Sequence, residues 1–246
     1  MATVAPKHNS TDTSTDTITP YQIENDGNIT VTNCAFDNVS LTPLHTGAST
    51  EKSLTVTNSK FTNNQKAGIR GINSKTVSVS GCTFTDCASG AVDFVKNDKR
   101  SDGDIVLLNN VINGANAFKL RDITNKVYVK GDDTSINVDT FFSYDIPNTY
   151  VTQYLIIYGG TYNINPSEYT TWNATYKDYV VAGYRSVAIE SSKFRVMEIV
   201  NVTVSADNAQ KVYGADDPKF TATVTGLENG DAISYNNSHS EAYAYV

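Results

Sequence analysis

The stretch ITVTNCAFDN (residues 29–38) recurs with small changes as LTVTNSKFTNN (residues 54–64) and VSVSGCTFTDC (residues 77–87). Each copy opens with alternating apolar and polar residues, then has Asn or Gly four residues after its start and Phe seven residues after it. Such alternation is typical of a strand with one buried face. Similarity that recurs every 20 to 50 residues or so, about the spacing seen here, predicts a repeat architecture.

The repeat extends over six units, whose starts are 22 to 28 residues apart. The column seven residues after the start is apolar in every unit except the fifth, which has Thr134 there. A second alternating segment follows the first in five units. The six starts are Ile29, Leu54, Val77, Ile105, Val127 and Leu155, and the core residues of the second segment are Leu44, Ile69, Val92, Phe118 and Phe142.

One such unit cannot bury its apolar residues alone, whereas stacked units pair their strands in parallel and share one core. With a spacing of about 4.8 Å between units, we expect an all-β parallel solenoid of about six rungs. Asn or Gly in the fourth column, as at Asn33, Asn58 and Gly81, suits a bend with left-handed backbone conformation, which strains most other residues.

The recurring pattern resembles the LxVxNSxFxxN pattern of the right-handed parallel β-helix in pectate-lyase-like proteins, over about residues 21–165. The resemblance implies the fold and leaves the activity open, because this scaffold serves enzymes, adhesins and phage spikes. In the enzymes that the pattern resembles, the site lies on outward positions of one parallel sheet. Several Asp residues there bind Ca²⁺ or act as a paired acid and base.

Three regions follow one another along the chain. Residues 1–20 are rich in Ser, Thr and Asp and read as a linker or tail, and residues 21–198 hold the solenoid with a capping segment. Residues 199–246 contain KVYGADDPKF and TVTGLENGD, which resemble the MBG-type immunoglobulin-like repeat of bacterial surface proteins. Because sandwiches of this kind usually have more strands, we expect a partial, truncated β-sandwich module there.

Residues 166–198 are predicted to cap the open end of the solenoid. The outward residues of the first strand are polar in the early units and become apolar in the later ones. An outward apolar patch is usually covered, so we expect the cap to lie over it; the alternative is that the patch binds a partner. The patch residues are Val106, Leu108, Tyr128, Ile156 and Tyr158.

Composition argues against several classes of protein. The formal net charge of −7 disfavours nucleic-acid binding, which depends on a dense basic surface. No apolar run approaches the roughly 20 residues of a membrane-spanning helix. The start, MATVAPKHNS, lacks the apolar segment of a signal peptide, so the chain is either cytosolic or a piece of a longer secreted protein. The resemblance to surface proteins favours the extracellular space or the cell surface.

The three cysteines are Cys34, Cys82 and Cys87. Cys34 and Cys82 share a column but lie two units apart, about 9.6 Å, which is beyond the reach of a disulfide. We expect buried, stacked thiols. A disulfide between Cys82 and Cys87 is the alternative.

The outward column of the second segment is the place to look for an enzyme site. It reads His45, Arg70, Asp93, Lys119 and Ser143. Glycoside hydrolysis needs two carboxylates about 5 to 9.5 Å apart, and Ca²⁺ needs several oxygen ligands, whereas this column has one carboxylate between two cations. We therefore expect an exposed charged ladder of Arg70, Asp93 and Lys119, with no catalytic residue, metal or cofactor.

Aromatic residues near the cap are the candidates for binding. Tyr and Trp give flat surfaces for contact with carbohydrate or protein. The alternative is that these side chains pack inside the cap. The candidates are Tyr150, Tyr169, Trp172 and Tyr176.

Together these observations favour a non-catalytic fragment of a secreted or cell-surface bacterial protein, acting as an adhesin-like stalk or binding scaffold. Carbohydrate or a host or cell-surface protein is the expected partner. The chain is expected to be a monomer that neither binds nucleic acid nor inserts into a membrane. The alternatives are a polysaccharide lyase or glycoside hydrolase on the same scaffold, and a phage spike-like protein, which would be a trimer.

Overall fold

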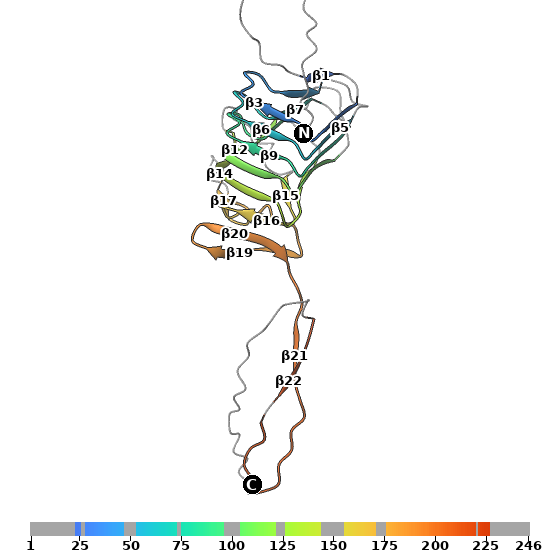
Figure 1. The fold of residues 1–246 in the computed structure, drawn as a ribbon. Coiled ribbons are helices and arrows are strands. Elements are labelled where there is room, and N and C mark those ends of the chain that lie inside the picture. The colour runs from blue at the N-terminus through green and yellow to red at the C-terminus, as the bar shows by residue number, and fades with distance from the viewer. Residues whose placement is uncertain are drawn as a thin grey trace, which may run out of the picture. The chain divides into compact units, whose positions relative to one another are not determined.

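The computed structural model of the chain divides into two compact units, Met1–Glu198 and Ile199–Val246, and the first unit is a stack of short strands (Figure 1). The predicted linker over residues 1–20 lies outside the described residues. The structure describes residues 23–25, 28–46, 53–72, 75–95, 104–121, 126–143, 155–170, 176–219 and 221–226.

Six parallel strands form one wall of the first unit, and the six predicted starts are in register along it. Ile29 pairs with Leu54 and Leu54 with Val77, and the register continues through Ile105 and Val127 to Leu155. The predicted parallel β-solenoid is therefore confirmed. The strands are β2 (Ile29–Thr32), β5 (Ser53–Thr57), β8 (Thr76–Ser80), β11 (Ile105–Leu108), β13 (Val127–Lys130) and β15 (Leu155–Ile157).

The second wall is a larger sheet that is parallel from β1 to β16 and ends in an antiparallel hairpin of β20 and β19. Three short strands, β3, β6 and β9, pair with one another and join this sheet through the long strand β12. The strands are β1 (Ile23–Asn25), β3 (Ala35–Asp37), β4 (Leu44–Thr46), β6 (Lys60–Thr62), β7 (Ile69–Ile72), β9 (Thr83–Thr85), β10 (Val92–Val95), β12 (Val111–Arg121), β14 (Ser135–Phe142), β16 (Gly160–Tyr162), β19 (Tyr184–Glu190) and β20 (Lys193–Glu198).

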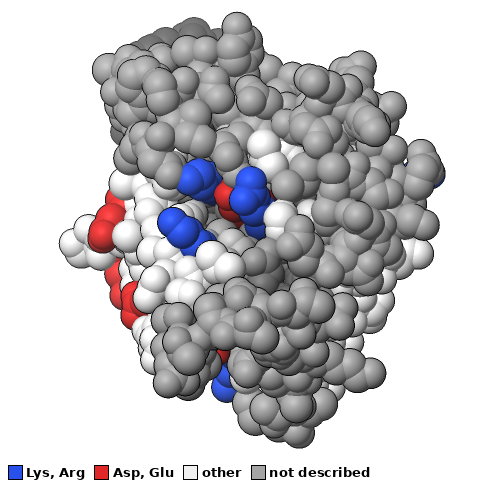
Figure 2. All heavy atoms as spheres, turned by 90° about the horizontal axis from the view of Figure 1, so that it is seen from above, with Lys and Arg blue, Asp and Glu red and all other residues white. Residues whose placement is uncertain are grey.

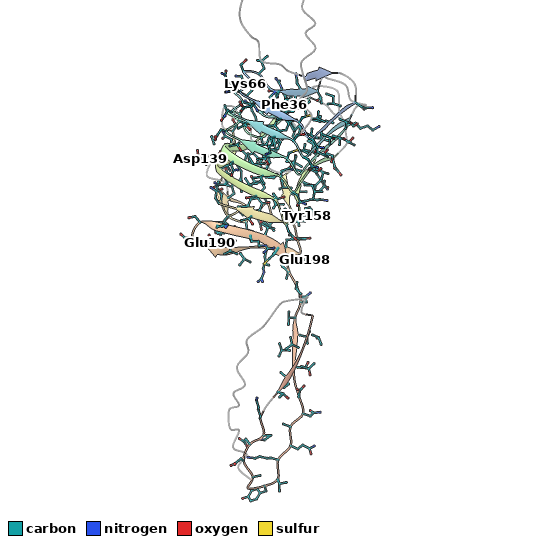
Figure 3. The ribbon with its side chains drawn as sticks, viewed as in Figure 1. Phe36, Lys66, Asp139, Tyr158, Glu190 and Glu198 are labelled. Carbon is teal, nitrogen blue, oxygen red and sulfur yellow. The ribbon has the colours of Figure 1, made fainter. Side chains whose placement is uncertain are left out.

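The core lies between the two walls and is built from the predicted columns. Phe36, Phe61 and Phe84 stack with ring centroids 4.9 and 4.8 Å apart, which matches the spacing of neighbouring strands in a sheet. Phe61 and Phe84 are fully buried, and Figure 3 shows Phe36 among the side chains of the first coils. Each coil therefore adds one ring to a continuous apolar column.

Two columns of left-handed residues turn the chain between strands. The predicted bend four residues after each start has positive φ at five of six positions; at the sixth, the adjacent Gly160 carries the positive φ in place of Gly159. A second bend, after β3, β6, β9 and within β12, was not predicted. The first column is Asn33, Asn58, Gly81, Asn109 and Gly131, and the second is Asn38, Asn63, Asp86 and Gly114.

Thr134, which interrupts the apolar column in the aligned sequence, is not the core residue of its coil. Ile136 takes that place, because it pairs with Ile112 on one side and Tyr162 on the other. Two extra residues are accommodated in the turn before β14, where the Thr134 hydroxyl donates a hydrogen bond to the Lys130 carbonyl, 2.6 Å away. The apolar column is therefore continuous through all six coils.

Cys34, Cys82 and Cys87 are buried free thiols, as expected, and Cys82 and Cys87 form no disulfide. Ser59 lies between Cys34 and Cys82, and each coil donates a backbone hydrogen bond to the next: Cys34 N–H to Ser59 Oγ (3.1 Å) and Ser59 N–H to Cys82 Sγ (3.5 Å). The Cys82 N–H donates in turn to Asn110 Oδ1 (2.9 Å). This column of small polar side chains satisfies buried N–H groups that no strand pairs.

The described residues of the predicted cap, 166–170 and 176–198, close the end of the solenoid. Val196 in β20 pairs with Gly160 in β16 and is fully buried. On the other wall, Ile157 donates a hydrogen bond to the Tyr179 carbonyl (2.8 Å) and accepts one from Val181 (3.1 Å). The cap therefore supplies hydrogen bonds to the last strand of both walls. It also contains the short antiparallel pair β17 (Tyr169–Thr170) and β18 (Tyr176–Lys177).

In the second unit, the described residues form one antiparallel pair, β21 (Thr203–Ala206) and β22 (Ala222–Thr225). Val204 lies opposite Val224, but the side chains of β21 are exposed and those of β22 are exposed or half-buried. The described residues of this unit therefore form a small antiparallel sheet. Residue 220 and residues 227–246 of the predicted partial sandwich module lie outside the described residues.

Candidate functional site

The outward ladder of the second wall is formed by strands β4, β7, β10 and β12. The parallel register places Arg70 beside Asp93 and Asp93 beside Lys119, as the alignment predicts, and places His45 beside Arg70. The Arg70 Nε lies 3.8 Å from the Asp93 Oδ2. The three predicted ladder residues are therefore brought together on neighbouring strands.

The Asp93 side chain is 10% exposed although it points outward, whereas the Arg70 side chain is 34% exposed. A buried carboxylate needs a charged or hydrogen-bonding partner, and here the neighbouring cation provides one. On the face seen from above, Lys and Arg side chains gather around an acidic side chain (Figure 2). The ladder was expected to be exposed, and this is wrong for its central residue.

The ladder extends one strand further than the sequence predicted, because Glu24 of β1 pairs with His45. The side chain of Glu24 lies outside the described residues. The signal for Glu24 was its alternating segment YQIEN (residues 21–25), which precedes the first start and was not aligned with the other second strands.

The aromatic candidates do not form a binding surface among the described residues. Tyr169 is 5% exposed and stacks on Phe141, with a centroid distance of 4.9 Å, next to Phe142 and Tyr179. It packs inside the cap, so the binding interpretation of Tyr169 is wrong. Tyr150, Trp172 and the side chain of Tyr176 lie outside the described residues.

A different set of aromatic residues faces outward on the six-stranded wall. The rings of Tyr128 and Tyr158 lie 6.0 Å apart, and the Lys130 ammonium lies over both, 4.8 and 4.9 Å from their centroids. Tyr128 and Lys130 belong to β13, and Tyr158, labelled in Figure 3, directly follows β15. We call Tyr128, Lys130 and Tyr158 the tyrosine–lysine cluster.

The cap covers the outward apolar patch only in part. Tyr184 packs edge-on against Tyr158 with a centroid distance of 5.6 Å, whereas Leu108 stays 40% exposed. The expectation that the cap lies over the whole patch is therefore wrong. The cap hairpin of β19 and β20 pairs with β16 through β20. It therefore contacts the patch only at the edge of the patch.

The chain matches two family models. The model of the right-handed beta helix region matches residues 21–165, which is more than half of the chain. The chain belongs to the right-handed β-helix family. A second model, the MBG domain (YGX type), matches residues 202–244 of this β-helix protein. Comparisons of the β-helix protein with curated proteins and with solved structures gave no significant match.

The combination of a β-helix with an MBG domain is typical of bacterial surface proteins. In the described part of this β-helix protein, no helix is long and apolar enough to cross a membrane. No three His, Cys, Asp or Glu side chains are grouped as metal ligands within those same residues. The outward chemistry that the structure does show is the charged ladder and the tyrosine–lysine cluster.

Proposed function

We propose that this β-helix protein is a non-catalytic section of a secreted or cell-surface bacterial protein, in which the solenoid is a rigid binding scaffold and the MBG domain is part of a stalk. The proposal is supported by the family matches to a β-helix region and an MBG domain. It is also supported by the arrangement of charges on the face where related folds carry enzyme sites.

The ladder carries the argument against catalysis. Asp93 has Arg70 on one neighbouring strand and Lys119 on the other, and His45, Arg70, Lys119 and Ser143 bring no second carboxylate to the column. A hydrolase needs its second carboxylate within reach of the same glycosidic bond. An Asp between two cations has its charge compensated, which suits a structural ladder.

Rigidity follows from the way the coils are held. The apolar column and the hydrogen-bonded side-chain column both run from coil to coil, so bending the solenoid would break contacts in each coil it crosses. A rigid rod presents its outer faces at fixed spacing. This is the property that a display scaffold requires.

The experiment is a product-release assay on a panel of uronate-containing and neutral polysaccharides, with and without Ca²⁺. Reducing ends report hydrolysis and the ultraviolet absorbance of unsaturated uronates reports lyase activity. We expect neither to rise above the level without protein. Turnover by the wild-type chain that is lost in Asp93→Asn and kept in Asp139→Asn, an exposed aspartate of β14, would overturn the proposal.

Light scattering tests the phage spike alternative, because such a protein is a trimer. A stalk section of this kind is expected to be a monomer at micromolar concentration. A trimer mass that persists on dilution would contradict the proposed function.

A further inference from the structure

We infer that the outer face of the six-stranded wall binds an acidic glycan, with the tyrosine–lysine cluster as its centre. The inference rests on the proposed function, because it names a ligand for the scaffold. It concerns a different wall from the charged ladder. No catalytic step is involved.

The cluster offers two aromatic rings and a fixed cation within one small area. The Lys130 ammonium is close to both ring centroids, and cation–π contact of this kind restrains a side chain that is otherwise flexible. The two tyrosines lie on neighbouring coils, so the spacing of the strands sets the distance between them. The charge is therefore held at one place on an aromatic surface.

Among the described residues, the strands of this face supply hydroxyl groups beside Lys130, and carboxylates lie at its edges. Within the six strands, Lys130 is the one charged residue at an outward position. Asp104 and Asp132 lie outside the strands, just before β11 and just after β13. Towards the first coils the outward rows become hydroxyls, and Thr32 and Thr57 are hydrogen-bonded to each other across 2.9 Å. The outward hydroxyl residues are Thr30, Thr32, Thr55, Thr57, Ser78 and Ser80.

This combination matches the chemistry of a sugar acid. The C–H face of a pyranose ring packs on an aromatic ring, its carboxylate pairs with an ammonium group, and its hydroxyls bond to Thr and Ser hydroxyls. Val106 and Ile156, which flank Tyr128, are half-buried. Leu108 is 40% exposed and borders the hydroxyl rows.

The test is titration calorimetry of the 246-residue chain with a mannuronate hexasaccharide and a hyaluronan hexasaccharide, each compared with its methyl ester. Esterification removes the carboxylate charge and keeps the sugar. We expect the wild-type chain to bind at least one acid form more tightly than its ester, and to bind it more weakly as salt is added. Binding of neither acid form would overturn the inference.

Two variants locate the site. Tyr128→Ala is expected to weaken binding about five-fold through loss of the stacking surface. Lys130→Met is expected to weaken it about five-fold and to abolish the preference for the acid over the ester. The matched controls are Tyr213→Ala, a fully exposed tyrosine of the second unit, and Lys126→Met, an exposed lysine just before β13. Both controls should bind like the wild type.

Each variant is checked for folding by its thermal unfolding midpoint. Wild-type affinity in both Tyr128→Ala and Lys130→Met would overturn the inference, as would an equal loss in the two controls. Product release in the assay above would instead overturn the proposed function. Absence of both binding and turnover would leave the scaffold proposal standing and reject its acidic-glycan ligand.

Discussion

Single residues with left-handed backbone decide where each coil of the solenoid turns. Asn and Gly in the first bend column were predictable, because their spacing is regular and their conformational preference is known. The second column was missed, since it mixes Asn, Asp and Gly and follows strands of three residues. Asn38 and Asp86 are residue types that occur in turns and in loops alike. The sequence alone therefore did not identify them as bend positions.

Alanine substitutions at Gly160 and Gly183 distinguish the free-energy cost of backbone strain alone from the cost of strain together with a steric clash. Both have positive φ, 99° and 89°. A Cβ on Gly160 would lie 2.8 Å from the Thr134 carbonyl oxygen, whereas one on Gly183 would meet nothing within 4 Å. Gly160→Ala is expected to lower the free energy of unfolding by about 4 kcal/mol and Gly183→Ala by about 1 kcal/mol. Equal losses in urea unfolding would contradict this account.

Cys82 predicts a stability change at alkaline pH. Burial raises the pKa of its thiol from 9.0 to about 11. Between those values the unfolded chain loses this proton and the folded chain keeps it, so the free energy of unfolding falls as pH rises from 9 to 11. The loss from this group is about 2 to 3 kcal/mol.

The matched variant is Cys82→Ser, because Ser59 already fills the equivalent place in the neighbouring coil. It keeps a hydrogen-bond acceptor and does not titrate in this range. Urea unfolding at pH 8, 10 and 11 should show a shallower decline for Cys82→Ser. Identical declines in the two proteins would show that the Cys82 thiol is not the group responsible.

Strands and turns are the scale at which the sequence was most informative. The alternation of residues predicted the register of all six strands of one wall, because parallel stacking places equivalent residues opposite each other. It failed at β14, where the turn holds two extra residues and shifts the core position from Thr134 to Ile136. It also failed to recognise β1, which precedes the first start.

The stack of phenylalanine rings predicts a position effect within one column. Phe61 is fully buried between two rings, whereas Phe36 is 9% exposed and contacts one. Phe61→Ala is expected to lower the free energy of unfolding by about 4 kcal/mol. Phe36→Ala is expected to lower it by only about 2 kcal/mol. Denaturant unfolding of both variants checks the order, and an equal or larger loss for Phe36→Ala would mean that the column does not act as a continuous core.

At the scale of the whole molecule, the buried core belongs to the first unit. Every buried apolar residue of the described chain lies between Ile29 and Val196. The sequence predicted the β-helix and the MBG resemblance, which the family models confirm. It could not predict the tyrosine–lysine cluster, because the ring contacts depend on how coils of unequal length come into register.

Truncation tests whether the solenoid is independent. A chain ending at Glu198 is expected to keep the wild-type unfolding midpoint within about 2 °C, because the second unit contributes no buried apolar side chain among its described residues. Differential scanning calorimetry of the two chains gives the comparison. A lower, broader transition in the shorter chain would show that residues 199–246 stabilise the solenoid.

The most direct test of the central claim is a single-turnover measurement of glycan length. The glycan that binds most tightly is incubated overnight with a molar excess of the wild-type chain, and its length is then determined by mass spectrometry. A binding scaffold returns the glycan at its original length and mass. A shortened glycan, or one carrying the mass change of an eliminated product, would contradict the claim.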